Sequence, residues 1–501
     1  MTNIEKYNEL IKLIEKMEFY GRICGRLSFD LNCVCPKNNM QQAGEDNNAI
    51  GMEIFKISHS KKFTTLVREL HENSDGLTNI QKELVKKEYK SYAKEKNVSA
   101  KLQMKWDKAA NDAYINWLDA KEKSDYSLFK PYLKKIVSVS KQVYLTRDVQ
   151  KETLYDTILD DYEPGWNIQK YDAFFNRLKE EIVPLVAKVS KSKKKIRDDF
   201  LSYPVKIYKQ EEFAKYLLLR EGHNFDNLVL MTTEHPFTSE INRNDVRVTT
   251  HYYEDNFISN LYTIMHEGGH ALFDLGEPDE LYKNHLDGEM TCAMHECMSR
   301  FFENMIARSK GFVHLIYPKF KELFAEEFKD VSEEELYLAS NIAKPSLIRC
   351  DADELTYPLH IMVRYELEKE LINGNPNFNS LNKKWNALYK QYLGIKVPGD
   401  KEGILQDVHW TDSYGYFPTY ALGSAYAAQI YHRMNQDFDI EEAIRNDQIS
   451  KIVDWLKSHA WNIASLKDPD EWIELVTGEK FNPDYYINYL KDKFTEIYDL
   501  K

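Results

Sequence analysis

Two histidines one helical turn apart, with a glutamate beside the first, are the residues of this chain best suited to chemistry. They are His266, Glu267 and His270 in the stretch MHEGGHALF, residues 265–273. In a helix, residues i and i+4 point the same way, so the two imidazoles can bind one metal ion. Such a metal lowers the pKa of a water to about 7, and Glu267 can then take its proton. The pattern predicts metal-assisted hydrolysis.

The surrounding residues predict the helix that this arrangement needs. Asp255 or Asn256 is suited to cap its start, and Gly276 followed by Pro278 is typical of its end. Opposite the histidines, one apolar stripe repeats at helical spacing, formed by Phe257, Leu261, Ile264, Gly268, Leu272 and Leu275. We therefore expect this segment to be an amphipathic helix with the histidines on its polar side.

Gly268 and Gly269 are unusual inside a helix, because each glycine costs about 1 kcal/mol relative to alanine. Gly268 belongs to the apolar stripe, where a missing side chain lets another element pack closely. Gly269 lies beside the histidines, where it is expected to leave room near a metal or substrate.

A hydrolytic metal site needs a third protein ligand and an open position. The segment GEMTCAMHECMSRFFENMI, residues 288–306, offers three glutamates at seven-residue spacing, which are Glu289, Glu296 and Glu303. His295 and Cys297 are rival ligands, although Cys297 falls on the apolar face and suits the core better. Spacing alone does not select among the three glutamates.

The remaining sequence predicts mainly helices. Of the 501 residues, 43% are hydrophobic and 29% are charged, which is enough apolar material for a substantial core. Strand character is confined mainly to residues 226–237 and 245–253, where Val246, Val248 and Thr250 alternate with polar residues. Since no repeat or flexible linker interrupts the chain, we expect one large helical domain over residues 1–501.

Charge and cysteine content narrow the class of protein. The net charge is −13, which gives no electrostatic footprint for nucleic acid or an anionic membrane. No run of 18 apolar residues is present, and the first residues are charged and amphipathic. Six cysteines in so long a chain are expected to be free thiols. We predict a cytoplasmic protein.

Several motifs in order resemble the carboxypeptidase Taq family of HExxH zinc metallocarboxypeptidases. Besides HExxH they are HPF (235–237), DVRVT (245–249), HECMSR (295–300), IRCDAD (348–353), GILQDVHW (403–410) and GYFPTYALGSAYAAQ (415–429). LSFDLNCVCP at 27–36 is similar to the family's aromatic-Asp segment, with Phe29 where tryptophan is usual. Cys297 likewise stands where serine is usual.

The resemblance implies an almost all-helical fold with a deep substrate groove, and the metal at the floor of that groove. It also implies removal of single C-terminal residues from peptides, with broad preference and poor action next to proline. Zinc, with cobalt or manganese as alternatives, and a homodimer are implied as well. HECMSR points to Glu296 as the third metal ligand.

An enzyme of this kind must also bind the terminal carboxylate of its substrate, and arginine suits this because its planar fork pairs with a carboxylate through two bonds. Arg349 in IRCDAD is the first candidate. The alternative is that Arg349 only pairs with Asp351 or Asp353. Gln406 is a further candidate for holding the terminus.

His409, Tyr416 and Tyr420 are candidates for polarising the scissile carbonyl, since a donor aimed at the developing oxyanion can contribute about 3 kcal/mol. The sequence does not choose between the tyrosines. The strand at 245–253 is expected to be an edge strand along which substrate backbone pairs. His235 and Arg247 are assigned to substrate binding, with bracing of that strand as the alternative.

Two other functions remain open at this point, and a third fails against the motifs. An endo-acting or dipeptide-releasing zinc oligopeptidase shares the metal chemistry, and would still cut a peptide whose C-terminus is blocked by an amide. A peptide-binding protein that keeps a structural metal is a second possibility, although Glu267 is retained with both histidines. A helical scaffold with a chance HExxH does not account for the other motifs.

Overall fold

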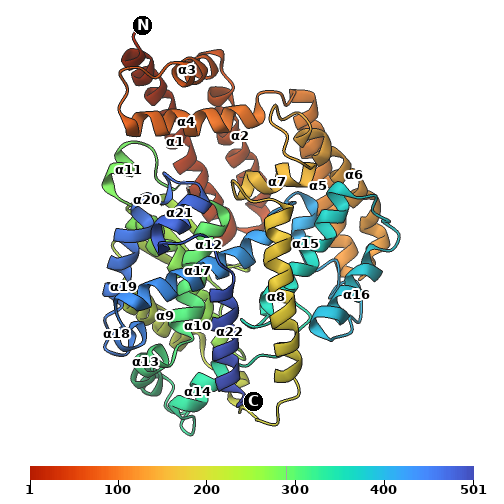
Figure 1. Ribbon diagram of the computed structural model, residues 1–501, viewed down its shortest axis with the longest axis vertical. Coiled ribbons are helices and arrows are strands. Elements are labelled where there is room, and N and C mark those ends of the chain that lie inside the picture. The colour runs from red at the N-terminus through yellow and green to blue at the C-terminus, as the bar shows by residue number, and fades with distance from the viewer. Residues whose placement is uncertain (289, 501) are drawn as a thin grey trace.

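The computed structural model describes residues 1–288 and 290–500, most of which are helical (Figure 1). Three strands form one small sheet among these residues. The predicted mainly α architecture with a small sheet is therefore confirmed. In the part of the chain that is described, no helix combines the length and the apolar character that crossing a bilayer demands.

A smaller lobe at the N-terminal end has its own hydrophobic cluster. It comprises α1 (Asn3–Cys33), η1 (Lys37–Asn39), α2 (Met40–Ser58), α3 (Lys61–Glu72) and α4 (Asn79–Glu95). Capping boxes at Thr2 and Thr78 begin α1 and α4 by satisfying backbone N–H groups that have no partner within the helix. Leu10 and Leu84 pack in this cluster with Leu281, which joins the lobe to the rest of the molecule. In Figure 1 the lobe is at the top.

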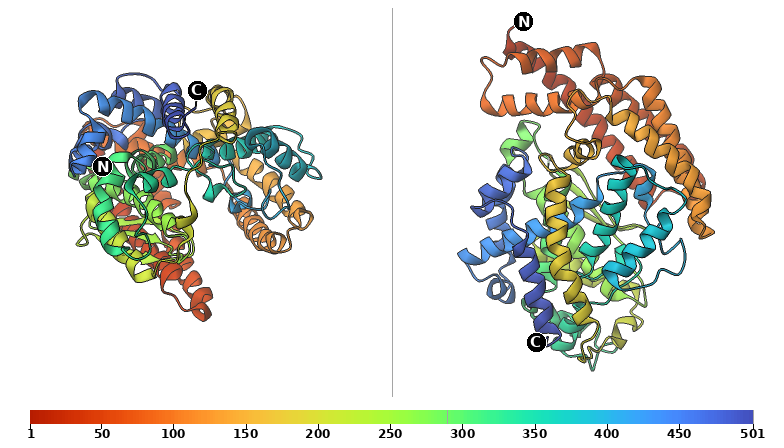
Figure 2. Two further views of the ribbon diagram at one scale, coloured as in Figure 1. Left: turned by 90° about the horizontal axis from the view of Figure 1, so that it is seen from below. Right: turned by 45° about the vertical axis from the view of Figure 1, so that its right-hand side comes forward.

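The next helices build one side of the main body. They are α5 (Ala100–Glu122), α6 (Tyr126–Tyr144), α7 (Leu154–Tyr162), α8 (Ile168–Val189), η2 (Asp199–Ser202) and α9 (Ile207–Glu221). Helices α5 and α6 pack against each other and lie at the margin of the molecule (Figures 1 and 2). Because their buried side chains belong to the main core, this pair is part of the same hydrophobic unit as the helices around the sheet.

The sheet has the order β1-β3-β2, formed by β1 (Leu228–Thr232), β2 (Thr238–Asn242) and β3 (Asp245–Thr250). Strand β3 pairs in parallel with β1 and antiparallel with β2. The expectation that 245–253 holds an edge strand is therefore wrong, because β3 is flanked on both sides and its backbone groups are used. Strand β2 was not predicted, since the sequence TSEIN lacks a clear apolar alternation.

The C-terminal half is helical. It comprises α10 (Phe257–Gly276), α11 (Asp279–Lys283), α12 (Cys292–Arg300), the π-helix η3 (Phe301–Ala307), α13 (Lys310–Leu323), α14 (Glu333–Ser340), η4 (Arg349–Asp351), α15 (Tyr357–Asn373), α16 (Leu381–Leu393), η5 (Val408–Thr411), α17 (Phe417–Asp437), α18 (Ile440–Arg445), α19 (Ile449–Leu456), the π-helix η6 (Lys457–Trp461), α20 (Asn462–Ala464), α21 (Pro469–Thr477) and α22 (Asp484–Ile497). Together with α5–α9 these helices form the main core, except for α11, whose Leu281 packs in the N-terminal cluster.

The packing around α10 positions the candidate site. Helix α10 lies against α9, α12, η3 and the sheet, so it is covered on most sides. Helix α17 packs on α12 at Gly423, where an added Cβ would lie 2.9 Å from both the Ala293 carbonyl oxygen and the Glu296 Cβ. The missing side chain at Gly423 thus lets α12 sit tightly between α10 and α17.

Candidate metal centre and active site

Helix α10 has the boundaries that the sequence predicts. Asn256 occupies the N-cap position, and the helix ends at Gly276 before Pro278. The apolar stripe is buried at Phe257, Leu261, Ile264, Gly268 and Leu272. Burial of this stripe fixes the rotation of the helix and directs the histidine side toward α12.

The two glycines of α10 mark close contacts on two faces. A Cβ at Gly268 would lie 1.8 Å from the Glu221 carboxylate of α9, so the predicted close packing there is confirmed. A Cβ at Gly269 would lie 2.8 Å from the Met298 carbonyl oxygen and 2.9 Å from the Ser299 Cα. The space at Gly269 is therefore filled by the backbone of α12. The expectation that Gly269 leaves room for metal or substrate is wrong.

His266, His270 and Glu296 come together at the junction of α10 and α12. Their ligand atoms all lie within 4.8 Å of one another. The Oε2 atom of Glu296 is 3.9 Å from His266 Nε2 and 3.7 Å from His270 Nε2. Two ligands of one zinc ion lie at most about 4.2 Å apart, because each sits about 2.0–2.1 Å from the metal. Both distances from Glu296 Oε2 are within this limit, so the carboxylate can share one divalent metal ion with either imidazole.

The other candidate ligands take different roles. Glu289 lies outside the described residues. Cys297 is fully buried in the core, as expected. His295 stacks on the ring of His270, with centroids 4.5 Å apart, and its Nε2 lies 3.0 Å from Asp274 Oδ1. His295 therefore packs against the candidate ligand His270 and stabilises its position.

Glu303 orients the first histidine. Its Oε2 lies 2.9 Å from His266 Nδ1, which leaves Nε2 of that ring facing the cluster. Arg300 and Arg308 also contact the Glu303 carboxylate, at 3.0 and 3.4 Å. Although burial opposes ionisation, Arg300 and the bond to His266 keep the pKa of Glu303 well below its usual range. A carboxylate behind a ligating histidine fixes its tautomer and its orientation.

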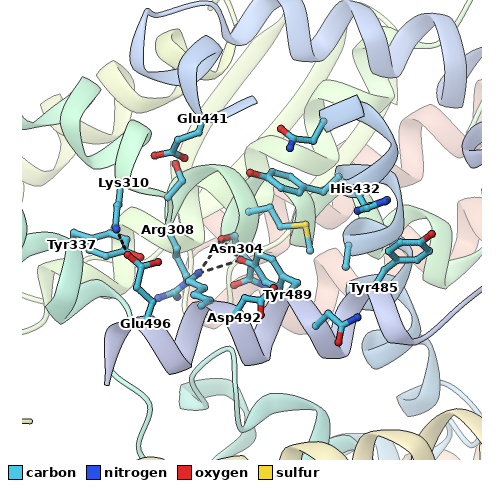
Figure 3. Close-up of a pocket in the computed structure, with 17 residues that line it drawn as sticks. Asn304, Arg308, Lys310, Tyr337, His432, Glu441, Tyr485, Tyr489, Asp492 and Glu496 are labelled. Carbon is cyan, nitrogen blue, oxygen red and sulfur yellow. Dashed lines mark hydrogen bonds and ion pairs between the residues drawn. The ribbon is translucent and has the colours of Figure 1, made fainter. Parts of the chain in front are cut away.

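A cavity of about 660 Å³ opens beside η3 (Figure 3). Asn304 and Arg308 contribute to its wall, together with Lys310 and Glu496 at its side. The three clustered ligands do not line it. Arg308 links its wall to the candidate metal centre through its contact with Glu303.

Glu267 is buried next to the cluster, with 7% of its surface exposed. The Thr238 hydroxyl donates to its Oε2 at 2.7 Å and to its backbone carbonyl at 2.9 Å. Burial raises the pKa of Glu267, and the charge of His266 and the Thr238 bond partly offset this. A carboxyl with a raised pKa can both take and return a proton near neutral pH. Thr238 belongs to β2, so the strand missed from the sequence orients the candidate base.

Arg349 lies in a network that fixes its side chain. Its Nε donates to Asp407 Oδ1 at 2.9 Å, while Arg364 donates to Asp407 Oδ2 at 2.8 Å. Although burial opposes ionisation, these two guanidinium groups hold the pKa of Asp407 well below its usual range. Asp351 and Asp353 form no ion pair with Arg349 among the described residues, so the alternative pairing is wrong.

Gln406 lies behind Arg349. Its Oε1 accepts from the Arg349 backbone N–H at 3.0 Å and from Arg364 Nη2 at 2.7 Å. Its Nε2 donates to the Leu347 carbonyl at 3.1 Å and to further backbone oxygens. The amide is thus engaged within the protein at both ends, which positions Arg349.

His409, Tyr416 and Tyr420 form an aromatic group beside Arg349. His409 Nε2 lies 3.4 Å from the Tyr420 hydroxyl, and the Tyr416 and Tyr420 rings meet edge-on at 5.1 Å. The Arg349 Cζ is 5.2 Å from the Tyr420 ring centroid. Burial, followed by the charge of Arg349, lowers the pKa of His409 to about 4. His409 is therefore neutral at pH 7.

Arg247 and His235, the other two residues predicted to bind substrate, lie in and beside the sheet. Arg247 donates to Asp245 at 2.9 Å and lies 4.9 Å from the Phe29 ring, so it ties β3 to α1. These contacts agree with the bracing alternative for Arg247. His235 lies in the segment that connects β1 with β2.

Several residues that complete the site carried little signal in the sequence. Arg300 donates to Glu296 Oε1 at 2.7 Å, and its i+4 spacing from Glu296 on a helix was the available clue. Tyr357 lies with its ring 4.1 Å from the Arg300 Cζ. Thr238, Arg364 and Asp407 come from distant segments, and only the fold brings them to the site.

Comparison with known proteins agrees with this geometry. The family model of carboxypeptidase Taq (M32) metallopeptidases matches residues 9–494. Carboxypeptidase 1 of Bacillus subtilis is 36% identical over 492 residues, which cover 98% of each chain. Thermostable carboxypeptidase 1 of Thermus thermophilus is 30% identical and covers 99% of this chain and 100% of its own. The crystal structure of the M32 carboxypeptidase from Deinococcus radiodurans matches with a TM-score of 0.95 at 28% identity, covering 99% of this chain and 100% of its own.

Proposed function

The chain belongs to the carboxypeptidase Taq (M32) metallopeptidase family, and we propose that it releases single C-terminal amino acids from peptides. It is a peptidase of the metallocarboxypeptidase class. The observation that carries the finer proposal is a buried arginine, Arg349, which is connected to the cluster of His266, His270 and Glu296 through Tyr357 and Arg300. Arg349 supplies the recognition of a free carboxylate that an exopeptidase requires.

The proposed ligands are His266, His270 and Glu296, and zinc is the metal that suits them best, with cobalt or manganese as alternatives. When bound, such an ion activates a water and polarises the scissile carbonyl. Glu296 presents Oε2 to the cluster, because Arg300 occupies its Oε1. His266 presents Nε2, because Glu303 engages its Nδ1.

Glu267 is the proposed general base and then general acid. Thr238 engages its Oε2, so its Oε1 is the atom available to take a proton from the attacking water. The raised pKa allows the same carboxyl to pass that proton to the leaving amine. This double use suits peptide hydrolysis, in which the nitrogen must be protonated before it departs.

Arg349 is the proposed anchor for the terminal carboxylate. Its Nε is held by Asp407 and its Nη1 lies 3.5 Å from the Tyr357 hydroxyl. Nη2 has no hydrogen-bond partner among the described residues and is the donor left for substrate. Tyr416 and Tyr420, with neutral His409, are proposed to donate to the carbonyl oxygen as charge develops there.

The resemblance also leads us to propose a broad preference with poor action next to proline, and a substrate groove above the metal. We further propose a homodimer that acts on peptides in the cytoplasm. All six cysteines are free thiols in the described part of the chain, which suits a reducing compartment. Light scattering coupled to gel filtration tests the homodimer by its mass.

The function is tested by incubating the metal-loaded protein with a mixed-sequence peptide and its C-terminally amidated twin. We expect a ladder of products that differ by one residue, from the free-acid peptide alone, when masses are followed over time. Internal cuts in both peptides would assign the protein to the oligopeptidases. Metal binding without cleavage of either peptide would favour a peptide-binding role.

A further inference from the structure

Tyr357 lies between the two halves of the site. It begins α15 and is buried, with 6% of its surface exposed. One face of its ring receives the Arg300 guanidinium, whose Cζ is 4.1 Å from the ring centroid. Its hydroxyl accepts from Arg349 Nη1 at 3.5 Å. A single side chain therefore contacts two cations, the partly buried Arg300 and the buried Arg349.

Apart from Tyr357, each of the two guanidinium groups donates to different carboxylates. Arg300 donates to the carboxylates of Glu296 and Glu303, at 2.7 and 3.0 Å. Arg349 donates to Asp407. Tyr357 thus connects the guanidinium that holds a metal ligand with the guanidinium that recognises the substrate terminus.

We propose that Tyr357 is a positioning residue that sets the spacing between the metal centre and the carboxylate anchor. The proposal rests on the function proposed above for Arg349. In a peptide, the carbonyl of the last peptide bond is separated from the terminal carboxylate by one residue. The metal centre and Arg349, which would bind these two groups, therefore need a fixed separation. If Arg349 is displaced, its contact with the terminal carboxylate weakens in the bound substrate and in the transition state alike, so KM rises while kcat stays unchanged.

The tyrosine side chain meets this need through its two ends. The ring face attracts a guanidinium and keeps Arg300 directed at Glu296. The hydroxyl limits how far Arg349 can turn, since the Arg349 Nε is already held on the other side by Asp407. Phenylalanine keeps the first contact and removes the second, whereas leucine removes both.

The test compares Tyr357→Phe and Tyr357→Leu with the wild type. Tyr317→Phe is the matched control, because it also removes one hydroxyl hydrogen bond, to the Val331 carbonyl at 2.9 Å, on peripheral helix α13. The readouts are KM and kcat on a free-acid peptide and the Kd for Zn²⁺ from chelator competition. Thermal melts establish which variants are folded.

For Tyr357→Phe we expect KM to rise about three- to tenfold while the Zn²⁺ Kd stays unchanged. For Tyr357→Leu we expect the same rise in KM together with a Zn²⁺ Kd about 2- to 30-fold higher. A general loss of folded enzyme would lower apparent kcat and leave both KM and Kd unchanged. The control Tyr317→Phe is expected to match the wild type in KM, kcat and the Kd for Zn²⁺.

An unchanged KM in Tyr357→Phe, or a fall in kcat alone, would overturn the proposal. So would an unchanged Zn²⁺ Kd in a folded Tyr357→Leu. If Tyr357→Leu does not fold, the KM of Tyr357→Phe decides. Failure of the proposed function is separable, because the wild type would then cleave the amidated peptide as well as the free acid.

Discussion

Arg300 donates from Nε to Oε1 of Glu296 at 2.7 Å, so the proposed ligand Glu296 has only its other carboxylate oxygen free for a metal. Oε2 is left facing His266 and His270. Glu296 and Arg300 both lie on α12, whereas His266 and His270 lie on α10. The position of α12 relative to α10 therefore decides whether the three proposed ligands come together.

Replacing Gly269 by alanine is expected to disturb this meeting. The new Cβ would lie within 3 Å of backbone atoms of Met298 and Ser299, so α12 must shift and carry Glu296 with it. We expect the free energy of unfolding to fall by about 1–3 kcal/mol and the Kd for Zn²⁺ to rise. Denaturant titration and chelator competition measure the two effects.

Gly21→Ala in α1 is the matched control. A Cβ at Gly21 meets nothing within 4 Å, so this change is expected to stabilise the protein by about 0.5–1 kcal/mol. If Gly269→Ala were stabilised as Gly21→Ala is, with an unchanged Kd for Zn²⁺, the close contact of α10 with α12 would contribute neither to stability nor to metal binding.

Glu267→Gln is expected to keep the metal and lose turnover. The amide preserves shape and can still accept from Thr238, but it cannot take a proton. We expect kcat to fall at least about 100-fold, with the Zn²⁺ content unchanged by elemental analysis. Glu280→Gln on the exposed surface of α11 is the control. Full activity in Glu267→Gln would exclude Glu267 as the base.

Glu368 is expected to make stability depend on pH. This buried carboxyl accepts from the Tyr155 hydroxyl at 2.6 Å and from the Gly415 N–H at 3.0 Å, and its Oε1 has no partner. Burial raises its pKa to about 8. Because the folded pKa lies above the unfolded value, the unfolded state loses its proton first, and stability falls as pH rises from about 4.5 to 8.

Glu368→Gln removes this dependence, since the amide resembles the protonated carboxyl. We expect equal free energies of unfolding for variant and wild type at pH 4.5, and a variant more stable by about 1–3 kcal/mol at pH 8. Exposed Glu326→Gln is the control and should show the wild-type slope. A Glu368→Gln slope identical to the wild type would mean that Glu368 is ionised when folded.

Local patterns predicted the parts of the site that lie on single helices. The bounds of α10, the direction of His266 and His270, and the burial of Cys297 follow from spacing and apolar periodicity. Gly269 was misread because its neighbour is the backbone of α12, which lies almost thirty residues further along the chain.

Contacts between distant segments account for what the sequence did not predict. Strand β2 has little apolar alternation, yet it supplies Thr238 to the candidate base. The position of β3 in the middle of the sheet depends on that same strand. Asp407 joins Arg349 and Arg364 across segments more than forty residues apart, a pairing that no periodicity encodes.

The central claim is most directly tested by competition between a free-acid peptide and its amidated twin in one reaction, with wild type and Arg349→Ala. In Arg349→Ala, Asp407 keeps its bond to Arg364, so the network behind the anchor is retained. We predict that the wild type consumes only the free acid, and that Arg349→Ala loses at least about tenfold in kcat/KM for it while binding Zn²⁺ normally. Equal preference for the free acid in Arg349→Ala and wild type would contradict the account.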